Sequence, residues 1–313
     1  MMKKISPYQK ISTFEDYTFY AQELFTILDF YRFAISLAAH QSIYYGHGTD
    51  NAMDDFAFLI LESLGLPNDF PSSEWHARLT SMEKDYLVEQ LFKRIALKIP
   101  VAYLVNKAYF CDLPFYVNED VLIPRSQIAE LIEVRFAPWI ENVETILDLC
   151  TGSGCIAAAL SEAFPEALID AIDIDAKALK VAQKNIEDLG LTQTVRFIQS
   201  NGMDALVDER YDIIVSNPPY VSQEEMQTLP TEYHHEPKLA LQADDFGLAL
   251  VHRILKDAVK YLKPQGILVV EVGNSDEALI EAYPDMPFVW LEFERGGHGV
   301  FLLTAEDLQA YFA

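Results

Sequence analysis

Hydrophobic and polar residues alternate in three different ways along the chain. From residue 10 to about residue 100, apolar side chains recur at three- and four-residue steps, which is typical of amphipathic helices. Residues 101–125 hold short β-rich pieces separated by turn signals. From residue 126 onward, strand-like and helix-like segments alternate, as they do in βαβ units. The pattern predicts a small helical domain over residues 1–100, a β-hairpin linker over 101–125 and an α/β domain over 126–313.

Three helices are expected in the first region, each with one apolar face. Asp50 is the expected N-cap of the second helix, and Gly65 is its expected stop. Thr80 and Glu83 have the spacing of a capping box at the start of the third helix. The expected faces are Leu24, Ile27, Leu28, Tyr31 and Ile35; Phe56, Leu59, Ile60 and Leu64; and Leu87, Leu91 and Ile95.

The α/β region contains short runs that are apolar on both faces, so its strands should be covered by helices on both sides. The expected strands are 145–150, 168–172, 195–199, 211–216 and 266–271, and the expected helices are 157–164, 176–189 and 248–262. Residues 289–293 and 300–303 are expected to form a terminal antiparallel hairpin. The predicted fold is therefore a Rossmann-like α/β sheet that is mostly parallel.

Acidic residues dominate the charge of the chain. There are 48 aspartates and glutamates against 23 lysines and arginines, which gives a formal net charge of −25. Such a field repels a phosphate backbone, because non-specific nucleic-acid binding rests on cationic side chains. It attracts a basic protein partner, although solubility alone is an alternative reason for the acidity. We expect no direct contact with nucleic acid.

Cysteines and apolar runs limit the class of protein further. The chain has three cysteines, Cys111, Cys150 and Cys155. Their number is odd and they lack the spacing of metal ligands, so neither a disulfide nor a bound metal is expected. Residues 1–7 lead into no secretory apolar core, and no run approaches the roughly 18 apolar residues of a membrane span. We expect a cytoplasmic protein without membrane contact, and its oligomeric state stays open.

A proline-rich loop follows the strand expected at 211–216. It reads Asn217-Pro218-Pro219-Tyr220, and its two prolines fix φ and remove two backbone donors. The Asn217 side-chain oxygen and the Pro218 carbonyl can accept both hydrogens of an NH2 group, and the Tyr220 ring can pack on a flat amide. The loop suits attack by a planar nitrogen on an electrophile; a plain proline-rich turn is the alternative.

A glycine turn follows the strand expected at 145–150 and opens a helix at Cys155. Gly152 and Gly154 let the backbone approach a ligand closely, and the helix N-terminus presents unpaired amides to it. A dinucleotide fingerprint has a third glycine where this chain has Ala157, and alanine is sometimes allowed there. The turn by itself therefore leaves a nicotinamide enzyme open.

Two carboxylates narrow the choice of cofactor. Asp173 ends the next strand, where it can accept both hydroxyls of an adenosine ribose. Capping the helix that begins near Ala176 is an alternative or additional role of Asp173, and Asp175 is the expected cap of that helix. Asp148 would repel a pyrophosphate, but it can help to hold a cationic amino acid or a sulfonium group. Together the two residues favour S-adenosyl-L-methionine over a dinucleotide.

Several stretches resemble one family of class I methyltransferases, the protein N5-glutamine methyltransferases. Besides the two loops, they are Leu-Ile-Pro-Arg-Ser at 122–126 and Tyr-His-His-Glu-Pro at 233–237. Members of this family modify either translation release factors or a ribosomal protein. The residues after Ile-Pro-Arg, together with 271–274 and 290–301, are similar to the branch that modifies the third protein of the large ribosomal subunit. The resemblance covers nearly the whole chain and implies a basic ribosomal protein as partner and a helical domain that recognises it.

The residues and the resemblance together nominate a site. Asn217, Pro218 and Tyr220 are the candidate catalytic residues, and Pro219 completes the candidate substrate-binding loop. The candidate cofactor contacts are Asp148, Cys150, Thr151, Gly152, Gly154, Asp173, Asn201 and Asn217. The family commonly has an acidic residue for the adenine amino group where this chain has Asn201, and Met203 is the candidate packing surface for adenine.

We expect a single displacement in which the glutamine amide nitrogen attacks the sulfonium methyl group, with the site contributing mainly position. No general base is required; His234 and His235 are candidates for one, but a structural role in the loop is favoured. Four alternatives stay open. They are glutamine methylation of release factors, amino methylation of DNA or RNA, a catalytically idle adenosine-binding assembly protein, and a nicotinamide oxidoreductase.

Overall fold

The computed structural model describes residues 7–313 and divides the chain into two compact units. Unit 1 extends to Lys107 and also includes Pro230–His235, whereas unit 2 consists of Ala108–Leu229 and Glu236–Ala313. Residues 1–6, which carry most of the expectation about a secretory signal, lie outside the described residues. In the part of the chain that is described, no helix is both long and apolar enough to cross a membrane.

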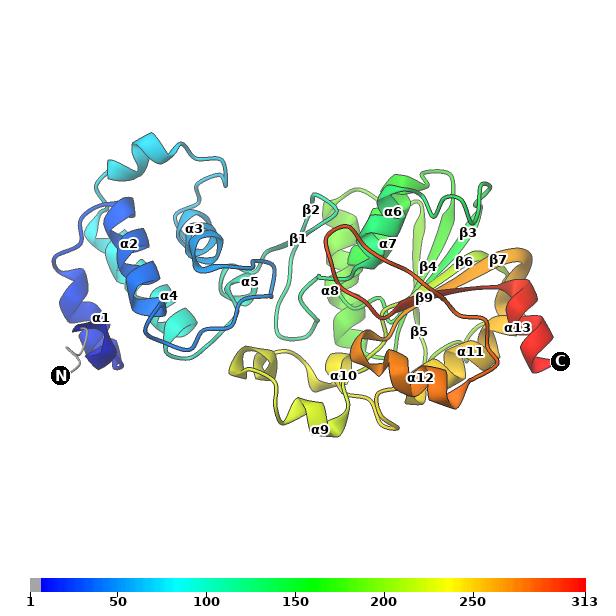
Figure 1. Cartoon of the computed structure of the whole chain (residues 1–313). Coiled ribbons are helices and arrows are strands. Elements are labelled where there is room, and N and C mark those ends of the chain that lie inside the picture. The colour runs from blue at the N-terminus through cyan, green and yellow to red at the C-terminus, as the bar shows by residue number, and fades with distance from the viewer. Residues whose placement is uncertain (1–6) are drawn as a thin grey trace. The chain divides into compact units, whose positions relative to one another are not determined.

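Unit 1 is helical (Figure 1). Its elements are the 3-10 segments η1 Pro7–Lys10, η2 Ser72–His76 and η3 Thr231–His235, and the helices α1 Phe14–Ala21, α2 Ile27–Ala38, α3 Ala52–Ser63, α4 Ser81–Ile95 and α5 Val101–Val105. Capping boxes begin α1, α2 and α4, because a threonine accepts from the backbone N–H three residues on and the acidic side chain there reaches back. The capping box predicted at Thr80 and Glu83 is confirmed.

Two predictions for unit 1 are wrong in detail. The N-cap of α3 is Asn51 instead of Asp50, because the Asn51 side-chain oxygen accepts from the Asp54 N–H at 3.0 Å. In α2 the predicted face is rotated, and Leu28 is 37% exposed. The buried residues of α2 are Ile27, Phe30, Phe33, Ala34, Leu37 and Ala38. This helix is apolar around most of its circumference, so packing against its neighbours selected the face.

Buried ion pairs hold the segment Pro230–His235 within unit 1. The Arg94 side chain, only 2% exposed, lies 2.7 Å from Asp55 and 3.5 Å from Glu232. The Tyr44 backbone N–H donates to Glu232 Oε1 at 2.9 Å. Removal of one of these charges would leave its partners buried and uncompensated. Residues that follow the Asn217 loop by little more than ten positions are thus part of the helical core.

Unit 2 is built on a seven-stranded sheet with the order β5-β4-β3-β6-β7-β9-β8. The strands are β3 Thr145–Leu149, β4 Leu168–Asp173, β5 Val195–Gln199, β6 Tyr211–Ser216, β7 Leu262–Glu271, β8 Val289–Trp290 and β9 Val300–Thr304. Neighbouring strands pair in parallel, except that β9 is antiparallel to both β7 and β8. The predicted mostly parallel sheet with a terminal antiparallel hairpin is confirmed.

Helices cover both faces of this sheet (Figure 1). The helices of unit 2 are α6 Ile128–Glu133, α7 Cys155–Ala163, α8 Ala176–Asp188, α9 Gln223–Met226, α10 Lys238–Leu241, α11 Ala249–Tyr261, α12 Asp276–Ala282 and α13 Ala305–Phe312, and the unit also contains the 3-10 segment η4 Gly273–Ser275. Leu147, Leu149 and Ile214 pack into the core beneath α11 and α13, while α7 and α8 contact β4 and β5. Successive residues of a strand face opposite helix layers, so both faces of the central strands are buried. This explains why these runs are apolar throughout.

The β-rich region expected from residue 101 begins later. Residues Val101–Val105 form α5, which follows Pro100 and is capped at its C-terminus by Asn106 with a left-handed φ of 52°. The hairpin itself consists of β1 Ala108–Phe110 and β2 Leu113–Phe115, and it belongs to unit 2. Cys111 and Asp112 form its two-residue turn with φ values of 47° and 61°, as the right-handed twist of a hairpin favours.

Candidate active site

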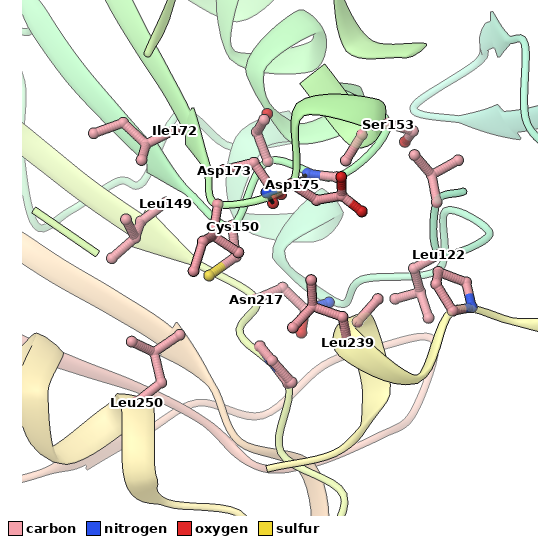
Figure 2. Close-up of a pocket in the computed structure, with 18 of the residues that line it drawn as sticks. Leu122, Leu149, Cys150, Ser153, Ile172, Asp173, Asp175, Asn217, Leu239 and Leu250 are labelled. Carbon is pink, nitrogen blue, oxygen red and sulfur yellow. Dashed lines mark hydrogen bonds between the residues drawn. The ribbon is translucent and has the colours of Figure 1, made fainter. Parts of the chain in front are cut away.

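A pocket of about 530 Å³ lies in unit 2 at the carboxyl ends of β3, β4 and β6. Strand order reverses at β3, which lies between β4 and β6, and open α/β sheets bind ligands at such a point. Figure 2 shows Asp173 at the end of β4, Asp175 in the loop after β4, and Asn217 in the loop after β6. The sheet therefore brings loops from distant parts of the sequence to one cavity.

The loop between β3 and α7 forms one wall of the pocket. Gly152 has a φ of 55° and lines the pocket. Gly154, with a φ of 78°, serves packing instead, because a Cβ there would lie 3.0 Å from the Cβ of Ala182 in α8. Cys150 adopts a φ of 66° and lines the pocket as a neutral thiol, since burial raises its pKa. Of the two glycines, only Gly152 lets the backbone approach a ligand.

Asp148 lies fully buried beneath this loop and is absent from the pocket wall. Its Oδ2 accepts from the Thr151 hydroxyl at 2.6 Å and from the Ala157 N–H at 3.1 Å. Its Oδ1 has no hydrogen-bond partner among residues 7–313. Burial raises the pKa of Asp148 to about 7, although both hydrogen bonds lower it. The carboxyl group thus braces the loop and holds an uncompensated oxygen close beneath it.

Asp173 connects two loops at the pocket wall. Its Oδ2 accepts from the Gly152 N–H at 2.9 Å, and its Oδ1 accepts from the Asp175 N–H at 2.9 Å. Burial raises its pKa, and these two hydrogen bonds act in the opposite direction. The expected cap Asp175 is confirmed, because its side chain accepts from the Lys177 N–H at 2.8 Å at the start of α8; Asp173 is not that cap. Each Asp173 oxygen keeps a second lone pair for a ligand hydroxyl.

The turn after β5 separates two residues that were expected to act together. Asn201 is exposed on the pocket wall. Met203 is 2% exposed and packs in the core that α11 covers, so the packing surface predicted there is wrong. Gly202 has a φ of 59° and reverses the chain between them. The apolar surface on the pocket comes from other elements, including Ile174 and Leu250.

The loop Asn217-Pro218-Pro219-Tyr220 leaves β6 at the pocket. The Ser216 hydroxyl donates to the Leu149 carbonyl at 2.7 Å and joins the ends of β6 and β3. Asn217 and Pro219 line the pocket, whereas Pro218 and Tyr220 do not. Across the described chain, neither the Asn217 side chain nor the Pro218 carbonyl makes a hydrogen bond. Both acceptors expected to receive an NH2 group are therefore unused by the protein itself.

A further wall combines the segment before α6 with the segment around α10. Arg125 forms a two-pronged ion pair with the buried side chain of Glu236, with nitrogen-to-oxygen distances of 2.7 Å and 2.6 Å. The Ile123 N–H donates to the same carboxylate at 3.0 Å. Figure 2 shows Leu122 and Leu239 among the residues around this part of the pocket. Arg125 and Glu236, which come from the two separate motif stretches 122–126 and 233–237, therefore meet in space.

Residues 135–236 match the family of methyltransferase small domains. A ribosomal protein uL3 glutamine methyltransferase of Francisella tularensis subsp. tularensis is 45% identical over 291 residues, which cover 92% of this chain and 93% of the relative. A protein of the same name from Neisseria meningitidis serogroup B is 46% identical over 291 residues, covering 92% and 96%. The chain belongs to the ribosomal protein uL3 glutamine methyltransferase family.

Solved structures show more distant similarity to this family member. A methyltransferase from Pyrococcus furiosus is 18% identical with a TM-score of 0.45, over 62% of this chain and 89% of that one. The assignment to the class I methyltransferase fold rests instead on the sheet order and on the family match.

The structure brings part of the nominated site to one pocket of this methyltransferase. The nominated residues that line it are Cys150, Thr151, Gly152, Asp173, Asn201, Asn217 and Pro219. Sequence reasoning missed several apolar lining residues, among them Ile174 and Leu239, which are 47% and 54% exposed. An apolar residue next to a motif is a signal that could have found both. His234 and His235 belong to unit 1, where His235 Nε2 lies 3.0 Å from the Leu97 carbonyl oxygen.

Replacing Asp148 with asparagine is expected to raise the free energy of unfolding at pH 8 by on the order of 1–3 kcal/mol. The asparagine oxygen can still accept from Thr151 and Ala157, and no buried charge has to form. The Asp148 pKa rises from 3.8 to about 7 on folding, so its contribution to stability is present below pH 4 and is lost toward pH 7. Urea unfolding between pH 4 and pH 8 measures the difference. A difference that stays constant over that range would contradict the raised pKa.

Proposed function

We propose that this protein transfers a methyl group from S-adenosyl-L-methionine to the side-chain amide nitrogen of a glutamine in ribosomal protein uL3. The observation that carries the proposal is the unused Asn217 side chain, which shares a pocket with the glycine loop and Asp173. The relatives from Francisella tularensis and Neisseria meningitidis, both named uL3 glutamine methyltransferases, support the acceptor.

The residues of the pocket fit S-adenosyl-L-methionine. Asp173 offers two carboxylate oxygens to the ribose hydroxyls, and Gly152 lets the backbone come close. Ile174 and Leu250 offer apolar surface to the adenine ring. The uncompensated Asp148 oxygen beneath the loop favours a cationic ligand over a pyrophosphate. When bound, this donor supplies an electrophilic methyl group on a sulfonium centre.

The Asn217 loop positions the acceptor. The Asn217 side-chain oxygen and the Pro218 carbonyl accept the two hydrogens of the glutamine NH2 group, which leaves the nitrogen lone pair directed at the donor. A bond forms between the amide nitrogen and the methyl carbon while the carbon–sulfur bond of the sulfonium breaks, so that the neutral thioether S-adenosylhomocysteine would leave. The nitrogen then releases one of its protons, which is acidic once the new bond exists. The chain therefore needs no strong general base, and catalysis rests on orientation.

Charge supports a basic protein acceptor. The formal net charge of −25 attracts a cationic protein and disfavours direct contact with a phosphate backbone. Because proteins are synthesised in the cytoplasm, we propose that the enzyme meets its acceptor there.

Unit 1 is proposed to recognise the acceptor protein. It exposes large apolar side chains, including Phe14 at 42%, Phe19 at 66% and Met82 at 79%. Acidic residues lie beside them in the sequence, such as Glu15 and Glu83. Apolar surface interspersed with negative charge suits a basic partner that also buries apolar contacts.

Mass spectrometry of acceptors incubated with the enzyme and isotope-labelled S-adenosyl-L-methionine tests the function. Purified uL3 and a translation release factor are offered separately, and label is mapped to single residues. We expect one methyl group on a glutamine side chain of uL3 and none on the release factor. Label on the release factor alone would overturn the acceptor but keep the chemistry. Absence of label on both proteins would overturn the proposed function.

A further inference from the structure

Buried hydrogen bonds lie directly behind the loop of residues 217–220. The Tyr220 hydroxyl donates to Glu271 Oε1 at 3.0 Å, and the Ser126 hydroxyl donates to Glu271 Oε2 at 2.6 Å. The Ile128 N–H donates to the Ser126 oxygen at 3.2 Å. Glu271 is 5% exposed and Ser126 is 7% exposed. One carboxylate therefore connects the loop to the start of α6.

The strand register carries Glu271 and Asn217 along neighbouring chain positions. Glu271 is the last residue of β7, and Ser216 of β6 pairs in parallel with Val270 of β7. Asn217 follows Ser216 and Glu271 follows Val270, so the same register aligns Asn217 with Glu271. Ser126, on the other side of Glu271, lines the pocket. Glu271 thus joins a pocket wall to the loop that carries Asn217.

Tyr220 is held closely on its other sides. A Cβ on Gly273 would lie 2.6 Å from Tyr220 Cε2, and a Cβ on Gly247 would lie 2.1 Å from the Tyr220 carbonyl oxygen. Both glycines have positive φ, 49° and 88°. The Ser275 hydroxyl donates to the same carbonyl at 3.0 Å. The ring packs against the backbone of Gly273, and its hydroxyl reaches Glu271.

We propose that Glu271, to which Ser126 also donates, is a positioning residue for methyl transfer, which acts through Tyr220 to hold Asn217 and the Pro218 carbonyl where they receive the glutamine amide. The inference rests on the proposed function, because it concerns the same loop. Pro218 and Pro219 make the loop stiff, so fixing it at β6 and at Tyr220 fixes the acceptors between. Tyr220 does not reach the pocket wall, so its influence passes through the backbone.

Hydrogen exchange tests the holding role without any acceptor. The Val221 N–H donates to the Leu241 carbonyl at 2.9 Å and reports on the loop end. In Tyr220→Phe and Glu271→Ala proteins, we expect exchange of this amide to become faster by roughly tenfold, because local opening costs less. In Glu271→Gln, an acceptor oxygen toward the Tyr220 hydroxyl is retained, and exchange should stay close to that of the wild type.

Steady-state kinetics with uL3 tests the catalytic consequence. Tyr220→Phe and Glu271→Ala should lower kcat by roughly 10- to 100-fold, whereas Glu271→Gln should recover most of the rate. The KM for uL3 and the Kd for S-adenosylhomocysteine should change by less than about threefold, since neither Glu271 nor Tyr220 lines the pocket. Combining Tyr220→Phe with Glu271→Ala should lower kcat no further than Glu271→Ala alone, because both remove one contact.

Tyr211→Phe is the matched control. The Tyr211 hydroxyl donates to Asp170 Oδ2 at 2.7 Å, and the two residues are 2% and 8% exposed. This bond has the same chemistry as the one between Tyr220 and Glu271, but it lies at the start of β6. Its loss should lower the melting temperature and leave both kcat and Val221 exchange unchanged.

Three results would overturn the proposal. They are unchanged Val221 exchange in the Tyr220 and Glu271 variants, faster exchange with unchanged kcat, and an equal loss of kcat in Tyr211→Phe. A wild-type enzyme that labels no uL3 would instead overturn the proposed function, and the exchange measurement would still decide whether Glu271 holds the loop.

Discussion

Asn217→Ala is expected to lower the rate of glutamine methylation by about 100- to 1,000-fold, the loss typical of removing one preorganised hydrogen-bonding group. The Asn217 side chain lies on the pocket wall and makes no hydrogen bond within residues 7–313, so its truncation breaks no internal contact. The amide of the acceptor would lose one of two groups that orient its nitrogen. Single-turnover methylation of uL3 measures the change.

Binding of S-adenosylhomocysteine by calorimetry separates this role from cofactor binding. The Kd of Asn217→Ala should stay within about threefold of the wild-type value, because the expected loss is in orientation of the acceptor. Asn142→Ala, an exposed asparagine before β3, provides the same substitution outside the pocket and should leave rate and Kd unchanged. A Kd that weakens in proportion to the rate would move Asn217 to the cofactor site.

Asp173→Ala is expected to weaken binding of S-adenosylhomocysteine by roughly 100-fold or more, since hydrogen bonds to a carboxylate contribute about 1.5–3 kcal/mol each. The substitution removes two acceptors for the ribose hydroxyls. It also leaves the Gly152 and Asp175 N–H groups without their present acceptor, so the loops on both sides loosen. Calorimetry on the purified protein measures the affinity.

The affinity of Asp173→Asn for S-adenosylhomocysteine, and the wild-type affinity measured over a range of pH, test the same role of Asp173. Asparagine keeps one acceptor oxygen, so its loss of affinity should lie between wild type and alanine. Burial raises the Asp173 pKa above 3.8, and only the ionised form accepts two hydroxyls without restriction. Wild-type affinity should therefore weaken as the pH falls, beginning at a higher pH than for an ordinary aspartate. An affinity that is flat from pH 8 to pH 4 in the wild type would contradict the assigned role.

Elements that depend on local pattern were predictable. The runs 195–199 and 211–216 became β5 and β6 with the same bounds, because short runs rich in β-branched and aromatic residues favour strands. The capping box at Thr80 and Glu83 was also predictable, because both partners lie within four residues of the sequence. In α2, by contrast, apolar residues on several sides left more than one face available.

Part of the candidate site also followed from the chain order. Once 145–150, 168–172 and 211–216 are parallel strands, the loops that follow them must meet at one edge of the sheet. That argument alone brings Gly152, Asp173 and Asn217 to one pocket, as the structure shows. The argument does not distinguish a residue on the pocket wall from one behind it. Asp148 and Gly154 were therefore nominated as cofactor contacts, although neither lines the pocket and both support the loop between β3 and α7.

The sequence by itself thus determined the order and type of the strands, the loops that meet, and the residues with suitable chemistry. Only the tertiary structure decided which groups complete each other across long separations. Arg125 and Glu236 are 111 residues apart, and Ser126 and Glu271 are 145 apart. Periodicity records which side of an element avoids water, but it holds no information about the partner that a buried carboxylate meets. That choice depends on the packing of the whole unit, where each buried charge or hydroxyl must find a partner in three dimensions.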